Sequence, residues 1–368
     1  MGWVLPLLVL VGSVVGLWVV ATGQLDGDDG GGASNTPSGL PSVTSSGPSA
    51  LVVQLDDAGG AVSFTLFALD GGDGGRGVLL PPSTMVEIPG FGLDRLSTAV
   101  ELGGVDLAAL SLRNLLSMDF AHVESVDPGA LADLGRTLGG LTVDNPARLD
   151  RLDDSGRVEV LWPAGPVTVE PEDAAAFLSI RAVGETDLER MVRHQRYWLA
   201  YFGARQGIVG VVDDPERDLD AFLDEAAARV GNLDFRILPV ETIGGPEELY
   251  GVDADGLIDL LRVLVPERAG ETSDRIRVQL LNGVGTPGLA EPVTARLLPS
   301  GAIVQLTGNA LDFNHRTTQI VYYRDEHLAS ALRIQEELGL GEVVKQRNPV
   351  DVVDVTVVIG SDLADQVQ

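Results

Sequence analysis

LVVQLDDAGGAVSFTLFAL, at residues 51–69, is the stretch that decides the fold. Its two apolar runs, 51–55 and 62–69, have the length and composition of β-strands. Two more strands are predicted at 77–81 and 122–126. Helical patterns alternate with the strands or follow them, at 107–116, 128–138, 170–180, 186–205, 218–230 and 253–264. This order predicts that residues 51–265 form a mixed α/β domain whose sheet is flanked by helices.

A second, smaller α/β domain is predicted downstream, after a polar linker at 266–275. The domain spans residues 276–362 and is followed by a short tail at 363–368. Its length, roughly 90 residues, is enough for an independent core. Strands are expected at 276–282, 302–306, 318–323 and 354–360, and helices at 288–298 and 325–338.

The charge of the chain is strongly acidic. Lys and Arg total 25 against 54 Asp and Glu, which gives a formal net charge of -29. Such a surface repels phosphate backbones, so nucleic-acid binding is disfavoured. The chain has no cysteine, which rules out disulfides, thiol nucleophiles and Cys-based metal sites.

The N-terminal segment predicts a membrane anchor. Residues 3–21 carry no charge, and as a helix they span roughly 28 Å, close to the thickness of a bilayer core. We therefore expect a transmembrane helix at 1–21 and a single-pass plasma-membrane protein whose bulk is extracytoplasmic. A cleaved signal peptide is the alternative, although the apolar stretch is long for one. Residues 22–50, rich in Gly, Ser and Pro, predict a disordered linker.

Five segments of the first domain resemble, in order, the LytR-CpsA-Psr (LCP) family of envelope proteins. LLPPSTMVEIPG (79–90) is similar to the family segment SIPRDTyVeIPG, and RLSTAVELGG (95–104) to KlNaAyayGG. The others are DFAHV (119–123), LGGLTV (138–143), and IR (180–181) followed by DLERMVRHQ (187–195). The resemblance covers roughly residues 51–265.

The second domain resembles the LytR C-terminal domain, which follows the LCP module in many actinobacterial chains. VQLLNGVGTPGLA (278–290) is close to the vevLNGtgvsGlA opening of that domain. TQIVYY (318–323) and DVTVVIG (354–360) match its TvIrY and vdVtVvlG strands. This match covers about residues 276–362.

The resemblance implies a function, and it also shows that several charged residues of the family motifs are missing from this chain. Active LCP proteins are membrane-anchored extracytoplasmic transferases that move a polyprenyl-pyrophosphate-linked glycopolymer onto peptidoglycan with magnesium. Pro82 and Ser83 stand at the Arg-Asp pair of the family motif, and Val183 stands at the second Arg of vRxR. The early R-S-D segment falls near 60–63, which has neither Arg nor Asp. Because a bound diphosphate needs several fixed cations and a metal held by carboxylates, these departures indicate a non-catalytic homologue with no catalytic residue, metal site or cofactor.

The helix predicted at 186–205 carries the remaining candidate site. Thr186 and Glu189 have the spacing of a capping box, which places the helix start there. Arg190, Arg193 and Tyr197 cluster on one face, opposite a broad apolar face. One interpretation is a solvated basic stripe; the other, which the resemblance supports, is a cleft that binds an anionic head group. The candidate anion-binding residues are Arg181, Arg190, Arg193 and Gln195.

Two other patterns do not predict sites. Residues 283–288 fit GxGxxG, but no acidic residue ends the next strand, so a tight turn is favoured over a dinucleotide site. The four histidines are isolated in sequence, with no metal-ligand spacing.

The sequence thus predicts a cell-envelope protein that binds wall glycopolymer, a polyprenyl-phosphate lipid or a partner envelope transferase without catalysis. One alternative is a working magnesium-dependent phosphotransferase in which Asp56, Asp57, Asp70 or Asp73 replaces the lost ligands. Another is a LytR-type transcription regulator, which the net charge and the apolar N-terminal segment oppose.

Overall fold

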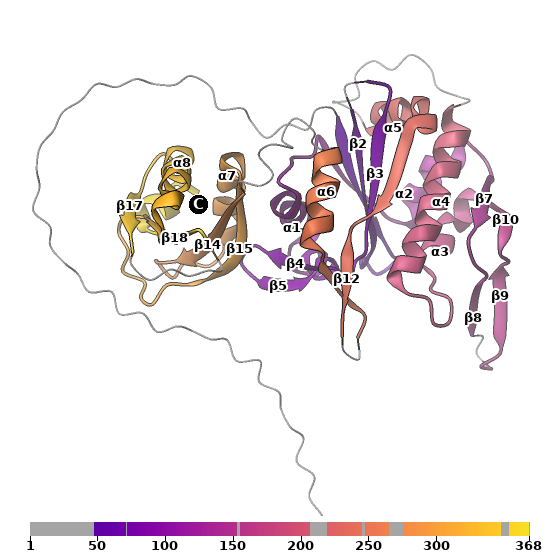
Figure 1. The fold of residues 1–368 in the computed structure, drawn as a ribbon. Coiled ribbons are helices and arrows are strands. Elements are labelled where there is room, and N and C mark those ends of the chain that lie inside the picture. The colour runs from indigo at the N-terminus through magenta and orange to yellow at the C-terminus, as the bar shows by residue number, and fades with distance from the viewer. Residues whose placement is uncertain are drawn as a thin grey trace, which may run out of the picture. The chain divides into compact units, whose positions relative to one another are not determined.

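The computed structural model describes residues 48–70, 72–152, 155–206, 219–244, 247–264, 275–346 and 353–367. It is built around two five-stranded sheets (Figure 1). The transmembrane helix and the linker expected at 1–21 and 22–50 lie outside these ranges, apart from the last residues of the linker. None of the helices in the described part of the chain combines the length and the hydrophobicity of a membrane-spanning segment.

The first sheet has the strand order β11-β3-β2-β1-β6. Its three central strands are antiparallel, whereas β6 and β11 pair in parallel with β1 and β3. The strands are β1 (Ser49–Leu55), β2 (Ala61–Leu69), β3 (Gly75–Leu80), β6 (His122–Val126) and β11 (Leu233–Ile237). The expected strands are therefore confirmed, to within about two residues at each end.

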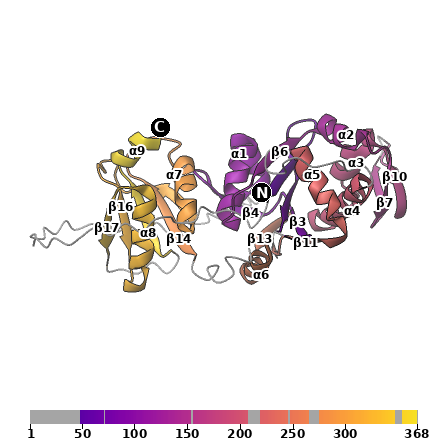
Figure 2. The same cartoon turned by 90° about the horizontal axis from the view of Figure 1, so that it is seen from above.

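Alternation along the central strands divides the core into two layers. Leu51 and Val53 of β1 face one cluster, and Ala50 and Val52 face the other. This follows because successive strand residues point to opposite faces of a sheet. Helices α1 (Leu96–Leu116) and α6 (Ala254–Leu264) cover the first face, and α4 (Asp187–Gln206) and α5 (Leu219–Ala228) cover the second (Figure 2).

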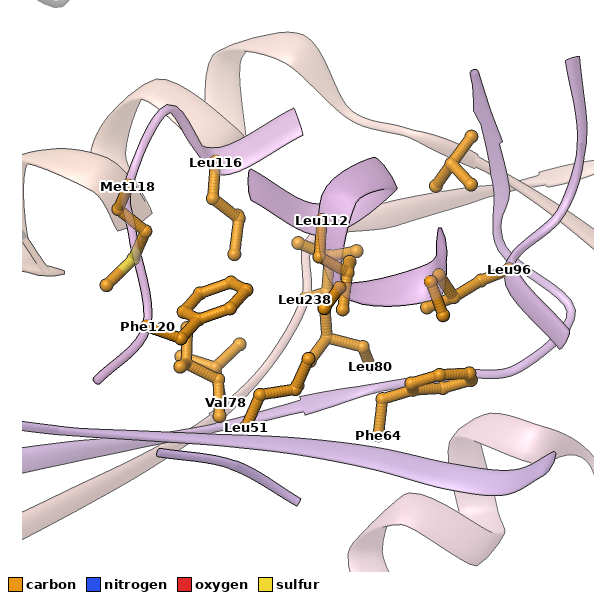
Figure 3. Close-up of a cluster of buried hydrophobic side chains, with 14 of the residues drawn as sticks. Leu51, Phe64, Val78, Leu80, Leu96, Leu112, Leu116, Met118, Phe120 and Leu238 are labelled. Carbon is orange, nitrogen blue, oxygen red and sulfur yellow. The ribbon is translucent and has the colours of Figure 1, made fainter. Parts of the chain in front are cut away.

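Figure 3 shows the layer on the α1 side. Leu51, Phe64 and Leu80 of the sheet meet Leu112 and Leu116 of α1, and all five are fully buried or nearly so. The cluster holds α1 against the sheet.

Smaller elements surround this sandwich. Helix α2 follows β6, and η1 with α3 replaces the single helix expected at 170–180. Four two-stranded ribbons pair β4 with β5, β7 with β10, β8 with β9, and β12 with β13. The bounds are α2 (Pro128–Arg136), η1 (Pro171–Asp173), α3 (Ala174–Ser179), η2 (Val230–Asn232), β4 (Met85–Ile88), β5 (Gly92–Arg95), β7 (Leu141–Asn145), β8 (Leu149–Leu152), β9 (Val158–Trp162), β10 (Gly165–Val169), β12 (Val240–Ile243) and β13 (Leu249–Val252).

The second sheet has the order β15-β14-β18-β16-β17, with β16 antiparallel to β18 and the other pairs parallel. Helices α7, α8 and α9 pack on it through a separate apolar core. The sheet and its helices confirm a second α/β layer structure in this region. The bounds are β14 (Ile276–Asn282), α7 (Ala290–Leu297), η5 (Leu298–Ser300), β15 (Ala302–Asn309), β16 (Gln319–Tyr322), η6 (Asp325–His327), α8 (Leu328–Leu338), β17 (Glu342–Lys345), β18 (Val355–Ile359) and α9 (Ser361–Val367).

Candidate functional site

The candidate site is built at the start of α4. The predicted capping box is confirmed: the backbone N–H of Thr186 donates to Glu189 at 2.8 Å, and the N–H of Glu189 donates back to the Thr186 hydroxyl at 3.2 Å. This cap fixes the helix start and places Asp187, which is only 3% exposed, in the first turn.

Asp187 is the centre of a buried polar network. The Ser83 hydroxyl donates to its Oδ2 at 2.5 Å, and the Arg190 guanidinium donates to its Oδ1 at 2.8 Å. Arg190 also donates to the carbonyls of Val62 at 2.9 Å and Ser179 at 3.3 Å. One guanidinium therefore ties α4 to β2 and to the end of α3. Burial lowers the pKa of Arg190, and the charge of Asp187 opposes that effect.

Arg193 lies one turn further along and is also buried. It pairs with Glu185, donates to the Ile180 carbonyl at 2.6 Å, and places its guanidinium over the Phe177 ring. Burial lowers the pKa of Arg193, while Glu185 favours the charged form. The interpretation of Arg190 and Arg193 as a solvated basic stripe is therefore wrong, because both side chains are enclosed by protein.

Arg181 joins the same network from the loop before α4. Its guanidinium pairs with Glu248 and lies 3.5 Å from Asp187. Glu248 also accepts from the Tyr250 hydroxyl at 2.5 Å and from the backbone N–H of Asp187 at 2.6 Å. Burial alone raises the pKa of Glu248, but these hydrogen bonds and Arg181 bring it below its usual value.

The structure brings three of the four predicted site residues together. Arg181, Arg190 and Arg193 interact electrostatically with Glu185, and Arg181 and Arg190 share Asp187. Gln195 follows on the same helix but points about 140° away from Arg190 and about 160° away from Arg193. It does not belong to the network.

Sequence reasoning missed the carboxylates that neutralise these arginines. Glu185 lies in an irregular loop, and Glu248 lies directly before β13, 61 residues from Asp187. Only the acidic excess of the chain hinted that each arginine would find a partner. Ser83, seen in the sequence only as a lost aspartate, is the direct hydrogen-bond partner of Asp187.

The proposed substitute magnesium ligands do not gather here. Asp56 caps its own turn through the N–H groups of Ala58 and Gly60, and Asp70 does the same with Gly72 and Gly74. These two turns lie at opposite ends of the nine-residue strand β2, about 26 Å apart along the strand. Only the turn of Asp56 is at the same end as Val62.

The donor set around Asp187 does not fit magnesium. Both Asp187 oxygens already accept from Ser83 and Arg190, and both Glu248 oxygens accept from Tyr250, Arg181 or a backbone N–H. Magnesium needs carboxylate oxygens free to complete a near-octahedral shell. Within the described ranges, no three His, Asp or Glu side chains form a metal-binding group.

The Gly-rich turn of the second domain is structural, as expected. The Asn282 side chain accepts from the N–H groups of Val284 and Gly285 and donates to the Thr286 carbonyl at 2.8 Å. A Cβ on Gly283 would lie 2.5 Å from the Ile359 carbonyl oxygen. The turn therefore needs glycine in order to pack against β18.

Two family matches agree with this architecture. Residues 78–202 match the LytR_cpsA_psr family, and residues 275–363 match the family described as LytR cell envelope-related transcriptional attenuator. The first match contains Ser83, Asp187, Arg190 and Arg193, so it includes most of the buried network.

Curated relatives of this chain are also proteins of cell-wall synthesis. The cell wall biosynthesis protein LcpA of Corynebacterium glutamicum is 26% identical over 293 residues, which cover 64% of this chain and 56% of LcpA. TagT of Bacillus subtilis, a polyisoprenyl-teichoic acid–peptidoglycan teichoic acid transferase, is 27% identical over 113 residues, or 30% of this chain and 35% of TagT. The chain therefore spans little more than half of LcpA and about a third of TagT.

Two solved structures are similar to this chain. A protein from Streptococcus agalactiae superposes with a TM-score of 0.50 at 14% identity, covering 60% of this chain and 87% of that one. A LytR-Csp2A-Psr enzyme from Actinomyces oris gives a TM-score of 0.48 at 21% identity, covering 61% and 93%.

The paired family matches and the curated relatives define a class: a cell-envelope protein related to wall teichoic acid and glycopolymer transferases. The chain carries a LytR_cpsA_psr domain over 78–202 followed by a LytR C-terminal domain over 275–363, and LCP proteins are its homologues.

Proposed function

We propose that this chain is a non-catalytic member of the family, which binds a wall glycopolymer, a polyprenyl-linked precursor or a partner transferase. We propose further that residues 1–21 anchor it in the plasma membrane and hold its domains outside the cytoplasm. Both statements go beyond the family relationship.

One observation carries the proposal: the charges of the site cancel within the protein. Arg181, Arg190 and Arg193 face Glu248, Asp187 and Glu185, so three cations are matched by three carboxylates. A diphosphate carries several negative charges, and it gains little from guanidinium groups whose hydrogen bonds are already made. Removing Asp187 from Arg190 would leave a buried charge unpaired, which costs roughly 3–5 kcal/mol. The network therefore favours a fixed structural role over phosphoryl transfer.

Arg181 is the exception that supports ligand binding. Its side chain is 41% exposed, against 7% for Arg190 and 3% for Arg193. An anionic head group could replace Glu248 at Arg181 without opening the core. Arg181→Ala should therefore weaken the binding of an anionic lipid, and Gln195→Ala, on the far side of the helix, should not.

Transfer activity is the direct test. The full chain would be incubated with a lipid-linked wall teichoic acid precursor, Mg²⁺ and peptidoglycan, and TagT would serve as the positive control. We expect no attached polymer above background under conditions in which TagT reacts. Magnesium-dependent transfer that disappears in Arg190→Lys would overturn the proposal and restore an enzyme.

The binding half of the proposal needs its own measurement. Native mass spectrometry of the full chain, gently extracted from its host membrane, would show what the protein retains. A bound polyprenyl lipid, glycopolymer or transferase is the expected result. If the chain repeatedly leaves the membrane with no companion of these classes, it is not a binder.

A further inference from the structure

Helix α1 is buried on two sides. Its second half, from Leu107 to Leu112, is enclosed at every position, which is unusual for a helix that packs on one sheet. Leu107 and Leu112 belong to the core beneath the first sheet. Leu110, Ser111 and Asn114 lie outside that core and are 6%, 1% and 2% exposed. α1 also contacts α7 and β15 of the second domain.

Asn114 makes the central contact of this second side. Its amide nitrogen donates to the carbonyl of Val304 at 2.8 Å, and its amide oxygen accepts from the N–H of Val304 at 2.8 Å. The side-chain amide thus satisfies both backbone groups of one residue, as a neighbouring strand would. Because Asn114 and Val304 are both buried, the pair is shielded from water.

Val304 lies in β15, which is the outermost strand of the second sheet. An edge strand leaves a row of N–H and C=O groups unpaired, and these groups can pair with a strand of another chain. β15 also has an irregularity directly after Val304: Val278 of β14 pairs with Val304, and Gln279 pairs with Leu306, so Gln305 is an extra residue. Such bulges interrupt edge pairing.

Two more side-chain contacts lie beside Asn114. Arg275 donates to the carbonyl of Leu115 at 2.9 Å and to the hydroxyl of Ser117 at 2.8 Å. The hydroxyl of Thr307, three residues beyond Val304, donates to Glu87 of β4 at 2.8 Å. The Arg275 and Thr307 contacts therefore flank the hydrogen-bonded pair of Asn114 and Val304.

We propose that Asn114 latches the edge strand β15 to α1 and so prevents the second sheet from pairing with the same edge of a second copy of this chain. The latch uses up the N–H and C=O of Val304, and the bulge at Gln305 interrupts the register beyond it. Thr307 ties β15 to Glu87, and Arg275, directly before β14, ties the same domain to the end of α1. This inference does not depend on the proposed function of the LCP domain.

Hydrogen exchange at single residues tests the latch. In the full chain, we expect the Val304 amide to exchange slowly although it faces away from β14. In Asn114→Ala, it should exchange roughly tenfold faster or more, because the loss of a buried partner is worth about one factor of ten or beyond. Amides of β14 should keep their protection. Asn145→Ala is the matched control, since Asn145 is equally buried but bonds to Pro163 within the first domain.

Measuring the molecular mass in solution over a range of protein concentrations tests whether the latch shields the edge of β15 from a second copy. Asn114→Ala should form dimers at concentrations where the natural chain and Asn145→Ala stay monomeric. Unchanged exchange at Val304 would overturn the latch, and fast exchange in a chain that remains monomeric would overturn the shielding. If Asn114→Ala unfolds, so that β14 loses protection as well, Thr307→Val decides the question. It removes only the Glu87 contact, and we expect a smaller acceleration at Val304; none would refute the latch.

Discussion

His194 shows how the buried network constrains a single residue. It is fully buried in α4, near enough to Arg190 and Arg193 to feel both charges, and its Nε2 lies 3.0 Å from the Leu178 carbonyl. Burial, and then the two guanidinium charges, hold the pKa of His194 well below its usual value of 6.5. The ring is therefore neutral, with Nε2 as the donor.

Acid should weaken the first domain through His194. Below pH 6.5 the unfolded chain binds a proton at this residue and the folded chain does not, so stability falls by up to about 1.4 kcal/mol for each pH unit. His194→Gln should remove this slope. Urea unfolding at several pH values measures it through the fluorescence of Trp162 and Trp198, because the second domain has no tryptophan. His315→Gln, in the second domain, should keep the slope; equal slopes in His194→Gln and the natural chain would contradict the assignment.

The site residues show what a sequence can reveal at this scale. Helical spacing correctly placed Arg190 and Arg193 together, because residues three apart share a face. It could not show that they are buried, since the partner of Arg190, Val62, lies on a distant strand and the partner of Arg193, Glu185, lies in an irregular loop. Gln195 was included through a motif, and its angle on the helix separates it from the others.

At the scale of elements, helix α1 is interrupted by Gly103 and Gly104. Gly104 has φ 73° and ψ −168°, a conformation that is essentially restricted to glycine. The predicted helix at 107–116 is the part after this break, and the part that begins at Leu96 was missed. Two adjacent glycines end a periodic pattern in sequence, and in space they form a kink between two helical segments.

A substitution at Gly104 should change the free energy of unfolding in a predictable direction. Gly104→Ala should destabilise the first domain by roughly 1–3 kcal/mol, since an L side chain is strained at that φ even though nothing lies within 4 Å. Gly203→Ala is the matched control: Gly203 is exposed and helical in α4, so alanine there should stabilise by about 0.5–1 kcal/mol. Both effects are read from the urea midpoint of tryptophan fluorescence. A neutral Gly104→Ala would mean that the break is not fixed.

Short ribbons are the elements that sequence patterns did not find. β4, β5, β12 and β13 are four residues each, and β12 is largely exposed, so each is too short or too exposed for a hydrophobic pattern to reveal it. One of them nevertheless supplies Tyr250, and the turn before it supplies Glu248. The unpredicted elements therefore complete the site.

At the scale of the molecule, the long central strands were predictable because both faces are buried. β1 and β2 are apolar at nearly every position, and each strand contributes to two cores. The contact between α1 and β15 was not predictable, since Asn114 is an ordinary polar residue in sequence and Val304 participates only through its backbone.

Glu87 links that contact to pH with a sign opposite to His194. Burial raises the pKa of Glu87 to about 7, and the hydrogen bonds from Thr307 oppose this rise only in part. Between pH 4.5 and 7 the folded chain therefore holds a proton that the unfolded chain has lost, so stability falls as the pH rises through this window. On acidification below pH 6.5, Glu87 adds stability while His194 removes it, and the natural chain shows only the difference.

Single variants should separate the two contributions. Glu87→Gln stays neutral at every pH, so its free energy of unfolding should not show the decrease that Glu87 causes between about pH 4.5 and 7. From pH 4.5 to neutral pH, the variant should therefore lose less stability than the natural chain. The acid-side loss due to His194 should then stand out. Urea unfolding followed by tryptophan fluorescence from pH 4.5 to 8 measures this, with Glu124→Gln on the exposed part of β6 as the control. Parallel curves for the natural chain and Glu87→Gln would show that Glu87 is not desolvated, and would therefore argue against the closed contact between Glu87 and Thr307.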